Sequence, residues 1–184
     1  MRVLAVDTAL GATSVAVVDF PAGRVLAVAS EPMERGHAEA LIPMVRATMA
    51  EAGTRFDQLD RIVTTVGPGS FTGLRVAISA ARAFGLAARI PVTGVSTLTA
   101  YAVPLIAAGS RTAIASAIDA RHGALFFESF WNDGKIANPP ALVSVEEAAQ
   151  RIKSWKTRVV GNATGPLTEA ARALGCDCEA VPCA

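Results

Sequence analysis

The sequence has few residues of the kinds that disulfide and metal chemistry require. It contains three cysteines, Cys176, Cys178 and Cys183, and two histidines, His37 and His122, which lie far apart in the chain. An odd number of cysteines so close together is not a disulfide framework. The Cys-x-Cys spacing also lacks the paired Cys-x-x-Cys motifs and the fourth ligand of a structural zinc site. We therefore expect reduced thiols near a loose C-terminus, with no metal and no cofactor.

An excess of one charge and long apolar runs are also missing. Lys and Arg number 17 and Asp and Glu 16, for a formal net charge of +1, whereas a protein that binds nucleic acid by itself usually has a basic excess. The N-terminus lacks the long apolar region of a signal peptide. The uncharged run over residues 90–110 is interrupted by prolines and glycines. We expect a soluble cytoplasmic protein with no membrane span, whose partner is a small molecule, a protein, or RNA reached only within a complex.

The alternation of apolar and turn-forming residues predicts an α/β chain in two parts. In the first part, we expect strands at residues 3–6, 13–20, 25–29, 61–66 and 92–95, and helices at 41–52, 76–89 and 98–108. In the second, we expect strands at 112–118, 124–130 and 158–160, and helices at 144–152 and 166–174, the first of these capped by Ser144. The predicted domains are residues 1–108 and a smaller domain, 109–184.

The stretch from Thr64 to Arg75 joins a predicted strand to an alanine-rich helix. Gly67 and Gly69 allow backbone angles that are closed to other residues, Pro68 fixes its own φ, and Ser70 can cap the helix. A helix start of this kind favours anions, so a phosphate loop is one interpretation. The spacing matches neither a Walker A loop nor Gly-x-Gly-x-x-Gly. We favour the alternative, in which the glycines shape the turn and allow close packing.

The helix that follows carries a strip of small residues, Gly73, Ala77, Ala81 and Gly85, at a spacing of four. Such a strip allows another helix to approach closely. A separate polar stripe contains Arg75, Ser79, Arg82 and Arg89. The helix is either an internal core helix or a subunit interface. In the second case, the interface residues would be Gly73, Arg75, Ala77, Ala81, Phe84 and Gly85.

The nine residues Gly67-Pro68-Gly69-Ser70-Phe71-Thr72-Gly73-Leu74-Arg75 resemble the signature of the bacterial TsaB proteins, also called YeaZ. The runs Val3–Thr8 and His37–Pro43 add to the resemblance, which is clear over about the first hundred residues. It implies an actin-like or sugar-kinase-like (ASKHA) fold with two related β-α domains, the second small. TsaB proteins are partners of the TsaD enzyme in making threonylcarbamoyladenosine in tRNA.

The same resemblance implies a degenerate nucleotide site at Asp7, Thr8 and Gly11. In kinases of this superfamily, an Asp-x-Gly-Thr turn holds metal–nucleotide, but Ala9 replaces the glycine here, and a Cβ crowds the approach of phosphate. Asp119 offers a second acid with the wrong glycine spacing. The metal-binding His-x-x-x-His pair of TsaD would fall on Thr97 and Tyr101, which are not usual ligands. We therefore expect no catalytic residue, and we expect Asp7 to hydrogen-bond the turn after its strand.

A cluster of cations surrounds Trp155: Arg151, Lys153, Lys156 and Arg158. Basic residues interleaved with an aromatic can bind single-stranded nucleic acid, but a solvated helix end with a packed tryptophan is the commoner case. RNA contact here is a secondary hypothesis.

These observations predict a non-catalytic subunit that pairs with TsaD and works with a TsaE-like ATPase. It would reach tRNA only through the complex and would form a homodimer when alone. The alternative is an ATP-dependent phosphotransferase or a hydrolase of the actin-like superfamily.

Overall fold

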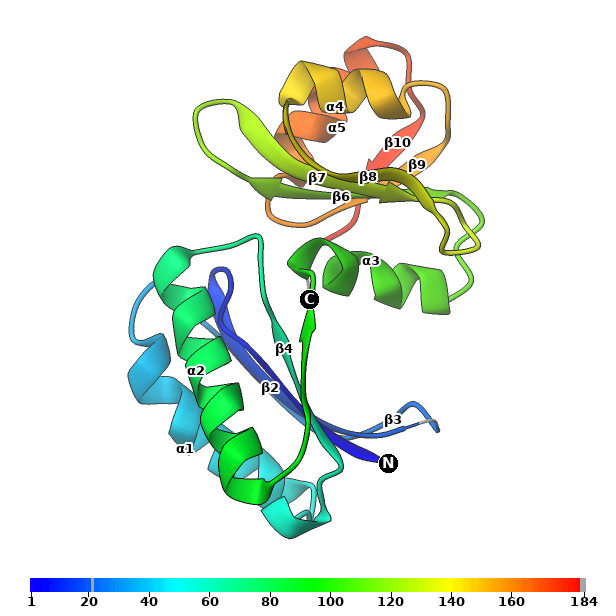
Figure 1. Ribbon diagram of the computed structural model, residues 1–184. Coiled ribbons are helices and arrows are strands. Elements are labelled where there is room, and N and C mark those ends of the chain that lie inside the picture. Colours follow the sequence, from blue (N-terminus) through cyan, green and yellow to red (C-terminus); the bar gives the residue numbers. More distant parts are fainter. Residues whose placement is uncertain (21, 183–184) are drawn as a thin grey trace. The chain divides into compact units, whose positions relative to one another are not determined.

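The computed structural model describes residues 1–20 and 22–182 of the 184-residue chain, so Cys183 lies outside the described part. The chain divides into two compact units, Met1–Thr97 and Leu98–Ala184. Each contains one five-stranded mixed sheet (Figure 1). The two α/β units confirm the predicted actin-like architecture.

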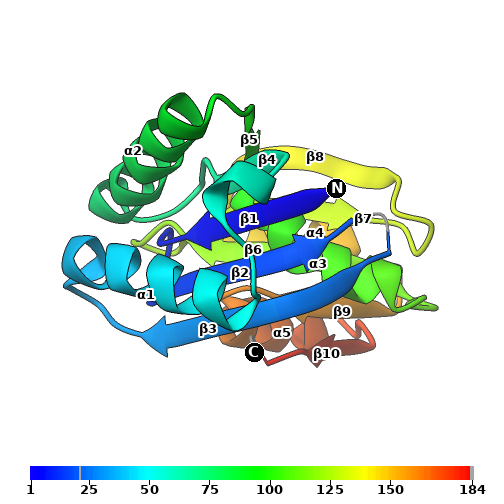
Figure 2. The same ribbon diagram turned by 90° about the horizontal axis from the view of Figure 1, so that it is seen from below.

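The first unit is a sheet with the strand order β3-β2-β1-β4-β5. Strands β1, β2 and β3 form an antiparallel meander, and β4 and β5 add in parallel (Figure 2). The elements are β1 (Arg2–Asp7), β2 (Ala12–Asp19), β3 (Arg24–Pro32), α1 (His37–Glu51), the short 3-10 helix η1 (Phe56–Gln58), β4 (Arg61–Thr65), α2 (Phe71–Ala88) and β5 (Val92–Val95).

One face of this sheet is buried under α1 and α2. Alternate strand residues point to that face because side chains alternate along a strand. They pack with the apolar stripes of the two helices in one buried cluster. Its members include Leu4, Val6, Val15, Val17 and Ile62 from the strands, and Leu41, Val45, Met49, Ala77 and Ala81 from the helices.

The second unit has the strand order β10-β9-β6-β7-β8. Its elements are α3 (Thr97–Ala107), β6 (Ala113–Asp119), β7 (Ala124–Phe130), β8 (Ile136–Ser144), α4 (Val145–Ile152), β9 (Thr157–Val160), α5 (Thr164–Ala173) and β10 (Cys178–Ala180). Sequence reasoning missed β8 and β10. Strand β8 contains Pro139 and Pro140, which argue against a strand unless it lies at a sheet edge, as β8 does.

Helix α3 belongs by its contacts to the second unit, whereas the predicted boundary after residue 108 put it in the first. Ala102 of α3 is fully buried in a cluster with Ile114, Phe130 and Val160 of the second sheet. The division at Leu98 follows from this packing. Helices α4 and α5 share a core with the alternate residues of β6 and β7, among them Ala115, Ala117, Leu125 and Phe127.

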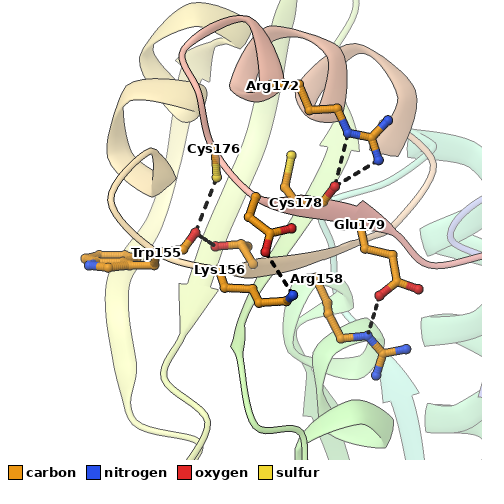
Figure 3. A network of polar contacts seen from close by, with 9 residues as sticks. Trp155, Lys156, Arg158, Arg172, Cys176, Cys178 and Glu179 are labelled. Atoms are coloured by element: carbon orange, nitrogen blue, oxygen red, sulfur yellow. Dashed lines mark hydrogen bonds and ion pairs between the residues drawn. The ribbon is translucent and has the colours of Figure 1, made fainter.

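A network of polar contacts holds the C-terminal end of the described chain to the second sheet (Figure 3). The Cys176 thiol donates to the Trp155 carbonyl oxygen at 3.3 Å, and the Arg172 guanidinium donates to the Cys178 carbonyl at 2.9 Å and 3.1 Å. Both thiols are buried. The expectation of a loose C-terminus is therefore wrong as far as Cys178, because β10 pairs in parallel with β9.

Burial and the neighbouring Cys178 thiol raise the pKa of the Cys176 thiol to about 11. A buried thiol that stays protonated is unreactive, because the thiolate is the nucleophile and the metal ligand.

Among the described helices, none combines the length and the apolar character that a membrane span would need.

Candidate functional site

The signature loop between β4 and α2 is seated on the turn between β1 and β2. The Ser70 amide donates to the Ala9 carbonyl oxygen at 2.7 Å, and the Thr8 hydroxyl donates to the Gly73 carbonyl oxygen at 2.6 Å. Thr8 and Ala9 are fully buried. The loop therefore covers the first two residues of the turn between β1 and β2.

This close approach requires glycine at two positions. A Cβ on Gly69 would lie 2.5 Å from the Ala9 carbonyl oxygen, and a Cβ on Gly73 would overlap the Thr8 carbonyl oxygen. Both obstacles are backbone atoms, so a change of rotamer cannot relieve them. Gly67 is required for another reason, because its φ of +112° is closed to most side chains. The predicted packing role of these glycines is confirmed.

Ser70 is the N-cap of α2, as predicted. Its hydroxyl accepts from the Gly73 amide at 3.3 Å, and the helix begins at Phe71. The start is earlier than the expected Val76, because the cap lets the glycine and threonine residues of the signature enter the first turn. Thr72 is exposed on that turn. The peptide between Gly67 and Pro68 is cis.

Asp7 hydrogen-bonds the turn after its strand, as predicted. Its Oδ1 atom accepts from the Ala9 amide at 2.8 Å and from the Thr65 hydroxyl at 2.5 Å. Gly11 lies at the end of the same turn, and its carbonyl accepts from the amide of Met33, just after β3, at 3.0 Å. The structure thus brings Asp7, Thr8 and Gly11 together, and each of the three makes a hydrogen bond that shapes the turn or its surroundings.

The other candidate chemical groups are also held in structural contacts. Asp119 accepts from the Arg121 amide at 2.8 Å. His37 at the start of α1 shares a 2.8 Å hydrogen bond with the Thr13 hydroxyl of β2, a buried contact that sequence reasoning did not find. The only signal was its place in the His37–Pro43 run. Within the described residues, no group of three or more His, Cys, Asp or Glu side chains could hold a metal ion.

Helix α2 turns its strip of small residues towards its own sheet. Gly73, Ala77, Ala81 and Gly85 are buried. A Cβ on Gly85 would meet the Ile90 carbonyl oxygen at 3.1 Å, and would overlap a methyl of Val92. Phe84 packs against Phe56 with ring centroids 5.5 Å apart. This corrects the expectation that the strip and Phe84 form a partner interface: these side chains are occupied within the first unit, and only Arg75 of that set is exposed.

The opposite side of α2 is exposed and partly apolar. Phe71 is 68% exposed and Leu86 is 83% exposed. The Arg75 guanidinium lies over the Phe71 ring, 3.8 Å from its centroid. A shallow hollow of about 670 Å³ lies near the C-terminal end of the helix, lined by Arg82, Ala83, Gly85, Leu86, Arg89, Ile90 and Val92. Sequence reasoning missed Phe71 and Leu86, because an apolar residue on an amphipathic helix is ordinarily assigned to the core.

The cations around Trp155 are mostly neutralised by neighbours. Arg151 pairs with Glu147 at 2.7 Å, Lys156 with Asp177 at 2.8 Å, and Arg158 with Glu179 at 3.7 Å (Figure 3 labels the last pair). Trp155 packs against Trp131 with ring centroids 4.3 Å apart. The contacts agree with the interpretation of a solvated helix end over a packed tryptophan, and RNA contact at this cluster remains a hypothesis.

The fold and this site define a class of protein: an actin-like α/β chain in which the signature loop packs on the turn between β1 and β2. The profile of the family described as TsaD, tRNA N6-adenosine threonylcarbamoyltransferase, matches residues 28–163. The structure of YeaZ from Pseudomonas aeruginosa superposes with a TM-score of 0.80 at 31% identity, over 92% of this chain and 79% of that one. The chain belongs to the TsaB (YeaZ) family.

Two further comparisons set the extent of the likeness. The tRNA threonylcarbamoyladenosine biosynthesis protein TsaB of Escherichia coli is 37% identical over 133 residues, which is 72% of this chain and 56% of the relative. The chain thus matches little more than half the length of that relative. The ROK hexokinase of Thermus thermophilus superposes with a TM-score of 0.54 at 15% identity, over 98% of this chain and 92% of that one, and shows the shared fold alone.

Proposed function

We propose that the chain is a non-catalytic partner subunit of a TsaD-like enzyme, in the threonylcarbamoyladenosine modification of tRNA next to the anticodon. A TsaE-like ATPase would complete the complex in the cytoplasm, and tRNA would be reached only through that complex. The names of the relatives support the pathway. The observation that carries the non-catalytic role is the seating of Ser70 and Gly73 on the carbonyl groups of Ala9 and Thr8.

The seated loop argues against nucleotide chemistry at the first hairpin. A phosphate group would have to approach the backbone of the turn, but Thr8 and Ala9, its first two residues, are buried beneath the loop. The side chain of Asp7 is engaged by the Ala9 amide and the Thr65 hydroxyl. A carboxylate that holds a turn together in this way is a structural group, and its removal would change folding before it changed any reaction.

The exposed side of α2 is the proposed docking surface for the TsaD-like partner. Exposed apolar side chains gathered on one surface mark interaction sites more often than those scattered singly. A second hollow of about 440 Å³ on α1, lined by Ile42, Pro43, Arg46 and Ala47, offers a further exposed surface on the neighbouring helix. In the absence of the partner, two copies of the chain would associate through the same helices.

Co-purification tests this proposal directly. A tagged chain is expected to retain the TsaD-like protein of the same genome, and Leu86→Asp is expected to release it. Leu142→Asp is the matched control, because Leu142 is an exposed leucine on β8 in the second unit. Failure of the unaltered chain to retain the partner would contradict the proposed role, and ATP turnover by the lone chain would favour a phosphotransferase or hydrolase.

A further inference from the structure

The near-zero net charge of the chain hides a long segment without acidic residues. Between Asp60 and Asp119, the sequence contains no Asp or Glu. All the charges of this segment are arginines: Arg61, Arg75, Arg82, Arg89 and Arg111. Three of them, Arg75, Arg82 and Arg89, follow one another at intervals of seven residues along α2 and its C-cap. Any surface built on this helix is therefore positive.

These three arginines share one side of the helix with the exposed apolar residues. At about 100° per residue, Phe71, Arg75, Arg82, Leu86 and Arg89 fall within an arc of about 60°. Seven residues are roughly two turns, so the arginines stand about 10.5 Å apart along the axis. All five side chains are exposed. We call these five residues the arginine face.

The charges of the arginine face are not neutralised within the chain. In the part of the chain that the structure describes, the guanidinium groups of Arg82 and Arg89 make no hydrogen bond or ion pair, and that of Arg75 lies over the Phe71 ring. The neighbouring helix α1 has Glu39 and Glu51 near its ends, and neither of them forms an ion pair with these arginines in the described residues. The face is thus both apolar and electrostatically unsatisfied.

We infer that the arginine face binds a protein surface that carries carboxylates about two helical turns apart, around an apolar centre. The inference rests on the proposed function and specifies the chemistry of the partner. Arginine suits such contacts, because its guanidinium can bind a carboxylate with two hydrogen bonds. Carboxylates repeated along one side of a partner helix would match the spacing of seven, as charges at the edges of paired helices do in coiled coils.

A second copy of the chain fits this face less well. When two α2 helices pair antiparallel about a two-fold axis, Arg82 faces Arg82, and Arg75 faces Arg89 of the other copy. Like charges placed opposite one another disfavour association. The charge pattern therefore selects an acidic partner over self-pairing, and self-pairing through this face should strengthen as salt screens the arginines.

Nucleic acid is also acidic, but it matches the apolar part of the face poorly. Leu86 is 83% exposed and lies between Arg82 and Arg89. A phosphate backbone bound to both arginines would therefore place charged phosphate groups against the apolar side chain of Leu86. Exposed leucine is better buried by apolar side chains of a protein, at roughly 25 cal/mol per Å² of apolar surface. We therefore assign the face to a protein.

The test measures binding of the chain to the TsaD-like protein of the same genome at several salt concentrations. We expect affinity to fall about tenfold between 50 and 500 mM salt. Arg82→Glu should weaken binding by at least about tenfold, and Arg82→Gln by less, because the first reverses the charge and the second only removes it. Arg24→Glu is the control: Arg24 is exposed on β3, across the sheet from α2, and its substitution changes the net charge equally.

The outcomes separate this inference from the proposed function. If the affinity for the TsaD-like protein changes neither with salt concentration nor with Arg82→Glu, the inference about the arginine face is wrong, while the partner role still holds. If the TsaD-like protein does not bind, the proposed partner role is wrong. The arginine face is then tested by measuring association of the chain with its own R75E/R82E/R89E variant. A mixed pair tighter than either self-pair would support the face, and no mixed pair would overturn it. Binding of tRNA by the lone chain, lost in Arg82→Glu, would overturn it in favour of RNA.

Discussion

Gly73→Ala tests whether the signature loop is a packing device. The added methyl would overlap the Thr8 carbonyl oxygen, and neither backbone can move away without breaking other contacts. Overpacking of this kind costs about 1–3 kcal/mol. Displacement would also stretch the buried bond from the Thr8 hydroxyl to the Gly73 carbonyl, which contributes about 1 kcal/mol. We expect the free energy of unfolding of the first unit to fall by about 2–4 kcal/mol.

Gly11→Ala is the matched control for this experiment. A Cβ on Gly11 would have no atom within 4 Å, and the backbone there is not left-handed. Its substitution should change stability by less than about 0.5 kcal/mol, as at other open surface positions. Gly11 lies in the turn between β1 and β2 and Gly73 packs against it, so a difference between the variants reports on packing and not on a general effect of substitution near this turn.

The assay must report on the first unit. Both tryptophans and the single tyrosine, Trp131, Trp155 and Tyr101, lie in the second unit, so their fluorescence does not follow the sheet that carries Gly73. Urea unfolding monitored by circular dichroism, with hydrogen exchange of the α2 amides, follows the right region. If Gly73→Ala and Gly11→Ala unfold alike within about 0.5 kcal/mol, the packing argument is refuted.

Three further predictions follow from the same contacts. Asp7→Asn keeps an acceptor oxygen for the Ala9 amide and the Thr65 hydroxyl, so it should lower stability by less than about 1 kcal/mol, whereas Asp7→Ala should cost about 2 kcal/mol by urea unfolding. Leu86→Asp should keep the melting temperature within about 2 °C, since Leu86 is exposed, yet weaken binding of the TsaD-like protein at least about tenfold by titration calorimetry. The raised pKa of Cys176 means that the folded state keeps its thiol proton longer than the unfolded state does. Its contribution to stability is therefore full below the ordinary pKa of 9.0 and is lost as the pH rises through about 11, a loss that Cys176→Ala should reduce in alkaline unfolding curves.

Local chemistry made much of the first unit predictable from the sequence. Ser70 caps α2 and Asp7 holds its own turn, because both depend on atoms a few residues away. The close packing of the signature glycines also follows from residue type. The residues that these glycines pack against could not be predicted from the sequence, because Thr8 and Gly73 are far apart in the chain and meet only through the pairing of β1 with β4.

The second unit was harder, because its strands break local rules that tertiary context overrides. Pro139 and Pro140 lack amide donors, and only the edge position of β8 makes them tolerable. The sequence also could not determine which neighbour the small-residue strip of α2 faces, for a related reason. Small side chains allow close approach of either a sheet or another helix, and the sequence does not say which of them is present. The structure turns the strip towards the sheet of the first unit and leaves Leu86 exposed on another side of the helix, which is why we propose the partner surface there.

The most direct test of the partner role is a reconstituted tRNA modification assay with the TsaD-like protein, the TsaE-like ATPase and threonylcarbamoyl-adenylate. We expect that modification requires the chain, that Asp7→Asn supports it within about twofold, and that the chain alone neither modifies tRNA nor turns over ATP. Turnover by the lone chain that disappears in Asp7→Asn would contradict the account, and so would full modification in the absence of the chain.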